Sequence, residues 1–169
     1  AHNYYNSIAQ EKTGDAWVNQ QLFDGRPSDD IEHADTVLFV GCNPWHSGGI
    51  PSARTVLKAI QKDPRRCMIV ADPRRTETAE MADIHLQLRP GTDAYLLAAM
   101  GAILVRDELV DHAFLEERTV GASDLVAALR QVPIEEFAER CGLDPALVVK
   151  ATHCFGQAER AVTHVDLGT

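Results

Sequence analysis

The sequence lacks most of the short motifs that mark an enzyme's active centre. It has no C-x-x-C pair, no H-E-x-x-H, no G-x-S-x-G and no G-x-G-x-x-G. Their absence argues against a zinc site, a hydrolase nucleophile and a standard dinucleotide fingerprint. It also has no apolar run of the roughly 18 residues that span a bilayer. The formal charge of -9 argues against binding to nucleic acid or to an anionic membrane surface.

Four cysteines are present, at positions too scattered for a metal site or a redox dithiol. We expect buried or half-buried free thiols and a reducing compartment, which favours the cytoplasm. The first residue is Ala1 rather than Met, and the sequence reads as a fragment of a longer polypeptide, so any targeting signal would lie outside it. We divide the fragment into a polar, helical lead-in, residues 1–34, and an α/β domain, residues 35–169.

The pattern along the chain predicts strands alternating with helices. Continuous apolar or β-branched runs bounded by turn residues indicate strands at 36–40, 67–71, 84–88 and 160–165. Helical spacing and turn signals predict helices over 8–22, a short one ending near 34, and others at 52–62, 93–105, 109–116, 123–130, 134–140 and 145–157. This order indicates an α/β fold: a Rossmann-like, three-layer domain with a mostly parallel sheet, followed by a helical C-terminal region.

Polar residues follow the first two predicted strands of this domain. Gly41 and Asn43 come after one strand, and Asp72 and Arg74 after the next. A right-handed crossover places both loops at the carboxyl edge of the sheet, so we expect Asn43 and Asp72 to be neighbours. An acid there can bind ribose hydroxyls and an amide can bind a phosphate or sugar. Gly and Asn are also ordinary turn residues, and Asp72 can simply cap the next helix.

A second loop of the same chemistry, Arg89-Pro90-Gly91-Thr92-Asp93, follows the third predicted strand. Thr92 can cap the next helix, and Asp93 either complements the helix dipole or reads a base. A carboxylate that accepts from a ring N–H and an exocyclic amine prefers guanine to adenine. In the first loop, Trp45 offers either a stacking surface or a core residue. Together the loops suggest one large anionic ligand with a nucleotide tail.

These motifs, in this order and spacing, resemble the molybdopterin oxidoreductase family, which includes formate dehydrogenases, nitrate reductases and dimethyl sulfoxide reductase. The resemblance covers most of residues 35–158. It rests on Gly41-Cys42-Asn43-Pro44, Val70-Ala71-Asp72-Pro73-Arg74-Arg75-Thr76-Glu77-Thr78-Ala79, Ala82-Asp83-Ile84-His85-Leu86, Arg89-Pro90-Gly91-Thr92-Asp93, Leu109-Val110-Asp111 and Phe114.

The resemblance implies a catalytic subunit that carries molybdenum or tungsten on two molybdopterin guanine dinucleotides, with a 4Fe-4S cluster outside this fragment. It also implies a small-molecule substrate such as formate or nitrate, the remaining domains of the same polypeptide and an electron-transfer subunit as partners. The fragment alone would not be catalytic. By the same resemblance, the residues that bind the cofactor are Asn43, Ser47, Asp72, Arg74, Gly91, Thr92 and Asp93, with Asp93 reading guanine.

Two departures from the family pattern concern the first loop and the metal. Relatives often have Ser-His-Pro where this chain has Ser47-Gly48-Gly49-Ile50-Pro51. The metal's protein ligand in relatives precedes the Gly-x-Asn loop by about the distance that separates the loop from Ser7, which makes Ser7 a candidate ligand. Two alternatives stay open: a nucleotide-binding domain with a divergent Rossmann loop, and a non-catalytic interaction module.

Overall fold

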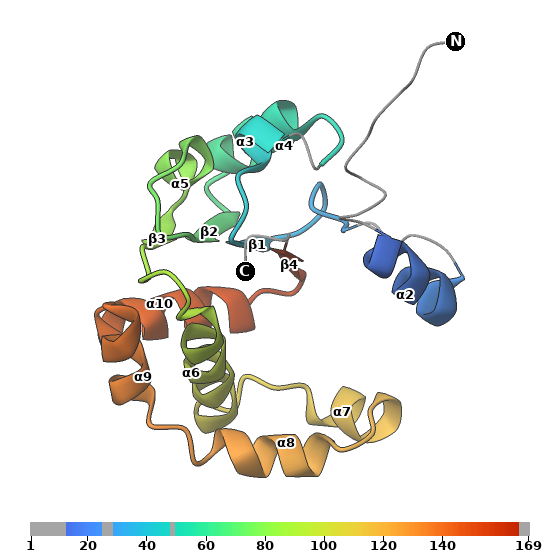
Figure 1. Ribbon diagram of the computed structural model, residues 1–169, viewed down its shortest axis with the longest axis vertical. Coiled ribbons are helices and arrows are strands. Elements are labelled where there is room, and N and C mark those ends of the chain that lie inside the picture. Colours follow the sequence, from blue (N-terminus) through green and yellow to red (C-terminus); the bar gives the residue numbers. More distant parts are fainter. Residues whose placement is uncertain (1–12, 25–28, 48–49, 166–169) are drawn as a thin grey trace.

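The computed structural model describes residues 13–24, 29–47 and 50–165, and its centre is a parallel sheet (Figure 1). The four strands are β1 (Thr36–Val40), β2 (Cys67–Ala71), β3 (Ile84–Leu86) and β4 (Ala161–Val165), in the order β3-β2-β1-β4. All neighbouring pairs are parallel. The predicted parallel α/β sheet is therefore confirmed. Alternating side chains of β1 and β2 enter two separate cores, one on each face of the sheet.

The first face of the sheet is covered by α3 (Pro44–Ser47), α4 (Ala53–Lys62) and α5 (Glu77–Met81). Val37 and Phe39 of β1 point into this layer and are fully buried. The apolar stripe of α4, Val56, Leu57 and Ile60, packs against them. The i, i+1, i+4 spacing of this stripe explains why the chain forms a helix here. The structure adds α3, four residues long, where the sequence predicts a loop.

The opposite face is covered by α6 (Asp93–Arg106), α9 (Ile134–Cys141) and α10 (Pro145–Gly156). Leu38 and Val40 of β1 point into this second core. Its helical members include Ala99 and Ile103 of α6 and Ala138 of α9, none of which is exposed. The small alanines let α6 and α9 approach the sheet and each other closely. Helices on both faces make the predicted three layers.

Three further helices lie away from the sheet: α2 (Thr13–Phe23), α7 (His112–Arg118) and α8 (Ala122–Leu129) (Figure 1). Within the described part of the chain, neither α7 nor α8 buries a single residue. The predicted start of α7 at residue 109 is three residues early. Asp111 is the N-cap, and its carboxylate accepts a hydrogen bond from the Phe114 N–H at 2.9 Å, which starts the helix at His112.

Two other local predictions are wrong. The segment before β1 is a turn rather than a short helix. The guanidinium of Arg66 donates hydrogen bonds to the carbonyls of Ile31 and Ala34, at 2.6 and 2.7 Å, and these carbonyls therefore do not accept from helical N–H groups. β3 ends at Leu86 rather than at residue 88, since its partner β2 ends opposite it at Ala71. In both cases tertiary contacts decide what the local pattern leaves open.

Two of the four cysteines are paired. A disulfide joins Cys67 of β2 to Cys154 of α10, so the expectation of a free thiol is wrong for these two. Cys141 is a free, buried thiol, as expected, and Cys42 is buried and takes no part in this disulfide. Among the described helices, none has the length and apolar character that crossing a membrane requires.

Candidate functional site

The register of the sheet brings three loops to one edge. Val40 of β1 pairs with Ala71 of β2 and with Val165 of β4, and Ala71 pairs with Leu86 of β3. All four strands therefore end at the same level. The loops that follow β1, β2 and β3 emerge side by side at the carboxyl edge; their described residues are 41–47 with 50–52, 72–76 and 87–92, and the first of them includes α3. This is where open parallel sheets bind ligands.

The first loop is tied to α5 by the side chain of Asn43. Its Oδ1 accepts from the hydroxyl of Thr78 at 2.6 Å and from the Thr78 N–H at 3.3 Å. Its Nδ2 donates to Oε2 of Glu77 at 2.8 Å. Asn43 therefore contacts the first turn of α5, and within the described residues it forms no hydrogen bond with Asp72. The two residues share an edge of the sheet, as predicted, without a hydrogen bond between their side chains.

Thr78 is the residue of this edge that the sequence analysis missed. It is fully buried, and its hydroxyl also accepts from the Trp45 backbone N–H at 3.2 Å. Glu77 beside it has a pKa below its ordinary value, chiefly because its own backbone N–H donates to it and also because of the Asn43 amide. Thr78 belongs to the motif on which the family resemblance rests, but no local pattern indicates its contacts with Asn43 and Trp45. Only the fold reveals that it faces the first loop.

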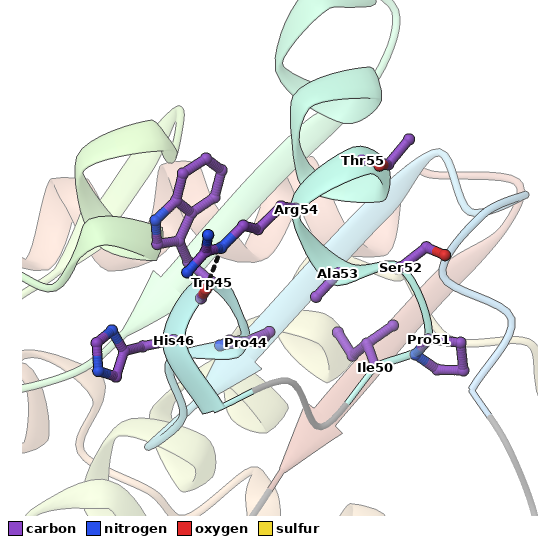
Figure 2. A pocket seen from close by; sticks show the side chains of 9 residues that line it. All are labelled: Pro44, Trp45, His46, Ile50, Pro51, Ser52, Ala53, Arg54 and Thr55. Carbon is purple, nitrogen blue, oxygen red and sulfur yellow. Dashed lines mark hydrogen bonds between the residues drawn. The ribbon is translucent and has the colours of Figure 1, made fainter.

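A pocket of about 500 Å³ opens between α3 and the start of α4 (Figure 2). The Trp45 ring is half-buried against the α4 core and lies 5.4 Å from both the Arg54 guanidinium and the Lys58 ammonium. Trp45 is thus a core residue with a cationic cover. None of the predicted site residues lines the pocket. Its lining is Pro44, Trp45, His46, Ile50, Pro51, Ser52, Ala53, Arg54 and Thr55.

The second loop folds back on itself and is held by β3. Oδ1 of Asp72 accepts from the Arg74 backbone N–H at 2.7 Å, which is a local turn. His85 Nε2 lies 2.9 Å from the Asp72 carbonyl, which can only accept, so Nε2 carries the proton. Gln87 Nε2 donates to the Pro73 carbonyl at 3.0 Å. The exposed guanidinium groups of Arg74 and Arg75 form no ion pair with any residue the structure describes, and they are free to meet an anion.

The third loop leads into α6. Gly91 has φ of +75°, a left-handed conformation that favours glycine. Thr92 stands at the N-cap as predicted, but its hydroxyl donates to the Arg89 carbonyl at 2.6 Å instead of capping the helix. Asp93 is half-buried in the first turn of α6. Its carboxylate makes no hydrogen bond or ion pair with the described residues, so both of its oxygens are available to accept hydrogen bonds from a ligand.

The two remaining predicted residues stand apart from these contacts. Ser47 is exposed at the end of α3, and its side chain bonds to no described residue. Ser7, the candidate metal ligand, lies outside the described residues. In the parts of the chain that are described, no group of three or more His, Cys, Asp or Glu side chains could hold a metal ion. The edge therefore offers guanidinium groups without an ion pair and glycine-containing loops, which suit a nucleotide's phosphates. It also offers a carboxylate without a partner among the described residues, which suits the base.

Comparison with known proteins gives the same family from several directions. The family model described as Molybdopterin oxidoreductase matches residues 1–163. The chain is 37% identical over 133 residues to the F420-dependent formate dehydrogenase subunit alpha of Methanocaldococcus jannaschii, covering 79% of this chain and 19% of the relative. It is 30% identical over 147 residues to the nitrate reductase of Synechocystis sp., covering 86% of this chain and 20% of the relative.

Solved structures agree with the sequence comparison. The acetylene hydratase from Pelobacter acetylenicus superposes with a TM-score of 0.77 at 28% identity, over 98% of this chain and 23% of that one. The chain thus spans about a fifth of the length of the curated relatives it matches. The family match covers nearly the whole chain and the fold agrees. The chain belongs to the molybdopterin oxidoreductase family.

Proposed function

We propose that this domain holds a guanine dinucleotide arm of a molybdopterin cofactor at the carboxyl edge of its sheet. The observation that carries the proposal is Asp93. It is a half-buried carboxylate in the first turn of α6, without a hydrogen-bond partner among the described residues, and it shares the sheet edge with the second loop, whose Arg74 and Arg75 form no ion pair with described residues. A buried or half-buried carboxylate without a partner is costly, and a ligand with two N–H donors would offset that cost.

The relatives support a role in cofactor binding rather than in substrate chemistry. By name they include formate dehydrogenases, a nitrate reductase and an acetylene hydratase. These names describe two redox reactions and one hydration, yet all of these proteins share this region with the present chain. A common cofactor explains this shared region more simply than a common substrate does. The whole protein's reaction then depends on parts beyond this domain.

The residues at the edge divide the work by chemistry. The guanidinium of Arg74 and the backbone N–H groups of the first loop, near Ser47, offset the pyrophosphate charge. Asp72 uses only Oδ1 within its turn, so Oδ2 can accept from a ribose hydroxyl. Gly91 and Thr92 shape the third loop, and Asp93 accepts from the guanine ring N–H and exocyclic amine. Asn43 fixes the first loop against α5 and acts on the ligand through its position.

When bound, the cofactor supplies molybdenum or tungsten for a two-electron reaction of the formate dehydrogenase or nitrate reductase kind. The residues of this domain orient it. Within this proposal the full polypeptide adds further cofactor-binding domains, a 4Fe-4S cluster and the metal's protein ligand, for which Ser7 is a candidate. A small-molecule substrate and an electron-transfer subunit are its partners. The domain by itself binds and does not turn over substrate.

The test is nucleotide preference, measured by isothermal titration of this chain with GDP and with ADP. We expect tighter binding of GDP, and we expect Asp93→Asn to abolish the preference because an amide cannot accept from both guanine donors. Asp124→Asn is the matched control, since Asp124 is also an acid in the first turn of a helix, α8. It should leave the preference intact.

The same titration separates the alternatives. A preference for ADP that Asp93→Asn leaves unchanged would indicate a divergent Rossmann domain for adenine nucleotides. No nucleotide binding, together with an unchanged melting temperature in the presence of either ligand, would favour an interaction module. Equal affinity for GDP and ADP would contradict the role given to Asp93.

A further inference from the structure

Arg89 begins the third loop, yet its side chain turns away from the open edge. The Arg89 backbone N–H donates to the carbonyl of Cys141 at 2.8 Å. Its Nη1 lies 3.4 Å from the carbonyl of Glu139 and 3.3 Å from that of Arg140. These carbonyls lie in the last turn of α9, where a helix runs out of N–H partners of its own. The Glu139 carbonyl also accepts from the Gly142 N–H at 2.9 Å, so Arg89 supplies further donors to the carbonyls of residues 139–141 and a favourable positive charge.

The same helix end holds the other side of the loop. Sγ of Cys141 donates to the Thr92 carbonyl at 3.4 Å, and the Thr92 hydroxyl donates to the Arg89 carbonyl at 2.6 Å. The loop is thus closed on itself and tied to α9 at both ends. α9 is firmly placed, since Ala138 and Cys141 are fully buried in the core beneath the sheet.

Gly142 makes this contact possible. It caps α9 in the left-handed region with φ of +75°. A Cβ built on it would lie 3.0 Å from Nε and 3.3 Å from Cγ of Arg89. The guanidinium therefore packs directly over the helix end, in space that only a glycine leaves open. This is an observation about shape, independent of the hydrogen bonds.

We infer that Arg89 and the C-terminal end of α9, residues 139–142, form a clamp that positions Gly91, Thr92 and Asp93 for the guanine base. Arg89 is a positioning residue and not a phosphate ligand. The inference rests on the proposed function of Asp93. It also adds a division among the arginines of this edge: Arg74 is free to bind phosphate, whereas Arg89 is committed to the protein.

The division predicts how binding depends on phosphate. A residue that positions the base-reading loop contributes equally to guanosine, GMP and GDP, because all three present the same base. A phosphate ligand contributes to GDP and not to guanosine. Arg89→Ala should weaken guanosine and GDP by the same factor, within about twofold. Arg74→Ala is the matched control, and should weaken GDP by about tenfold while leaving guanosine unchanged.

A measurement without nucleotide tests the clamp itself. Hydrogen exchange of the backbone amides of Arg89, Gly91, Thr92 and Asp93, followed by mass spectrometry, should be about tenfold faster in Arg89→Ala than in the unmodified chain and unchanged in Arg74→Ala. Arg89→Lys keeps the charge with a single donor group and should recover part of the protection. Cys141→Ser keeps a donor toward the Thr92 carbonyl and should retain more protection than Cys141→Ala.

The possible results separate the two proposals. Unchanged exchange in Arg89→Ala would overturn the clamp and leave the role of Asp93 standing. A loss of GDP binding without loss of guanosine binding would make Arg89 a phosphate ligand and overturn the inference. If the unmodified chain shows no preference for guanosine over adenosine, the proposed function fails, and the positioning role for guanine fails with it, whatever the exchange shows.

Discussion

The first and third loops of the sheet edge use their polar side chains in opposite ways. In the first loop, both ends of the Asn43 amide are bonded to α5, through Thr78 and Glu77. In the third loop, the Asp93 carboxylate bonds to no residue that the structure describes, while the backbone around it is held by α9. The side chain of Asn43 in the first loop thus stabilises the sheet edge itself. In the third loop the backbone is held in place by α9, and the side chain of Asp93 is available to a ligand.

The largest effect on stability is expected at the first loop. Asn43→Ala removes the acceptor of a fully buried threonine hydroxyl, and we expect it to lower the free energy of unfolding by about 2 kcal/mol. Urea denaturation measures this. Thr78→Val removes the same hydrogen bond at nearly constant volume, so the double variant should cost less than the sum of the single ones. Strictly additive costs would show that the two side chains do not interact.

A smaller effect on stability is expected at the third loop. Asp93→Asn removes a favourable charge from the first turn of α6 and should lower the free energy of unfolding by less than about 1 kcal/mol. The same variant loses its preference for GDP in the titration described above. If its stability loss equalled that of Asn43→Ala, the contrast between a building residue and an available one would be broken.

The pKa of Glu77 gives a further test of the contrast between the first and third loops. In the folded protein its pKa lies below the ordinary 4.5, so Glu77 stabilises the fold above that pH, and the stabilisation is lost as pH falls through the lowered value. In Asn43→Ala one of its donors is gone, and the pKa should rise toward 4.5. Carboxyl chemical shifts followed by NMR against pH report it. An unchanged pKa would mean that only the backbone N–H matters.

The smallest effect concerns the thiol behind the third loop. Burial raises the pKa of Cys141, so little thiolate forms near neutral pH and alkylation should be slow. Mass spectrometry after iodoacetamide treatment of the native protein at pH 8 should find Cys141 largely unmodified. Arg89→Ala loosens the loop that covers it and should speed the reaction. Equal rates in the two proteins would argue that the loop does not limit access to the thiol.

The sequence is sufficient where a residue's surroundings are set by its neighbours in the chain. The apolar runs at 36–40 and 67–71 predict strands covered on both faces, and the structure buries both from two sides. The shared edge of Asn43 and Asp72 follows from the parallel pairing of the two strands that precede them. The place of Asp93 at the start of a helix also follows from the local pattern, and the structure puts it in the first turn of α6.

Prediction stops where the partner comes from elsewhere in the chain. Asn43 bonds to Thr78, 35 residues away, and Asp72 instead closes a local turn on Arg74. In the sequence, Arg89 looks like one more cation of a nucleotide-binding loop. In the structure its guanidinium donates hydrogen bonds to carbonyls at the end of α9, about 50 residues later. No local pattern contains these pairings. They depend on how helices on either face of the sheet are packed.

The position of β4 has a consequence for the order in which the protein can fold. β1 lies between β2 and β4, and Thr36 pairs with Ala161, a residue 125 positions later. During synthesis, β1 and β2 emerge early and can pair, but one side of β1 stays open until nearly the whole described chain has left the ribosome. Over that interval an apolar strand presents an unpaired edge, which is prone to association with other chains. A nascent chain stalled before residue 161 should therefore depend on chaperones, whereas one extended past β4 should not.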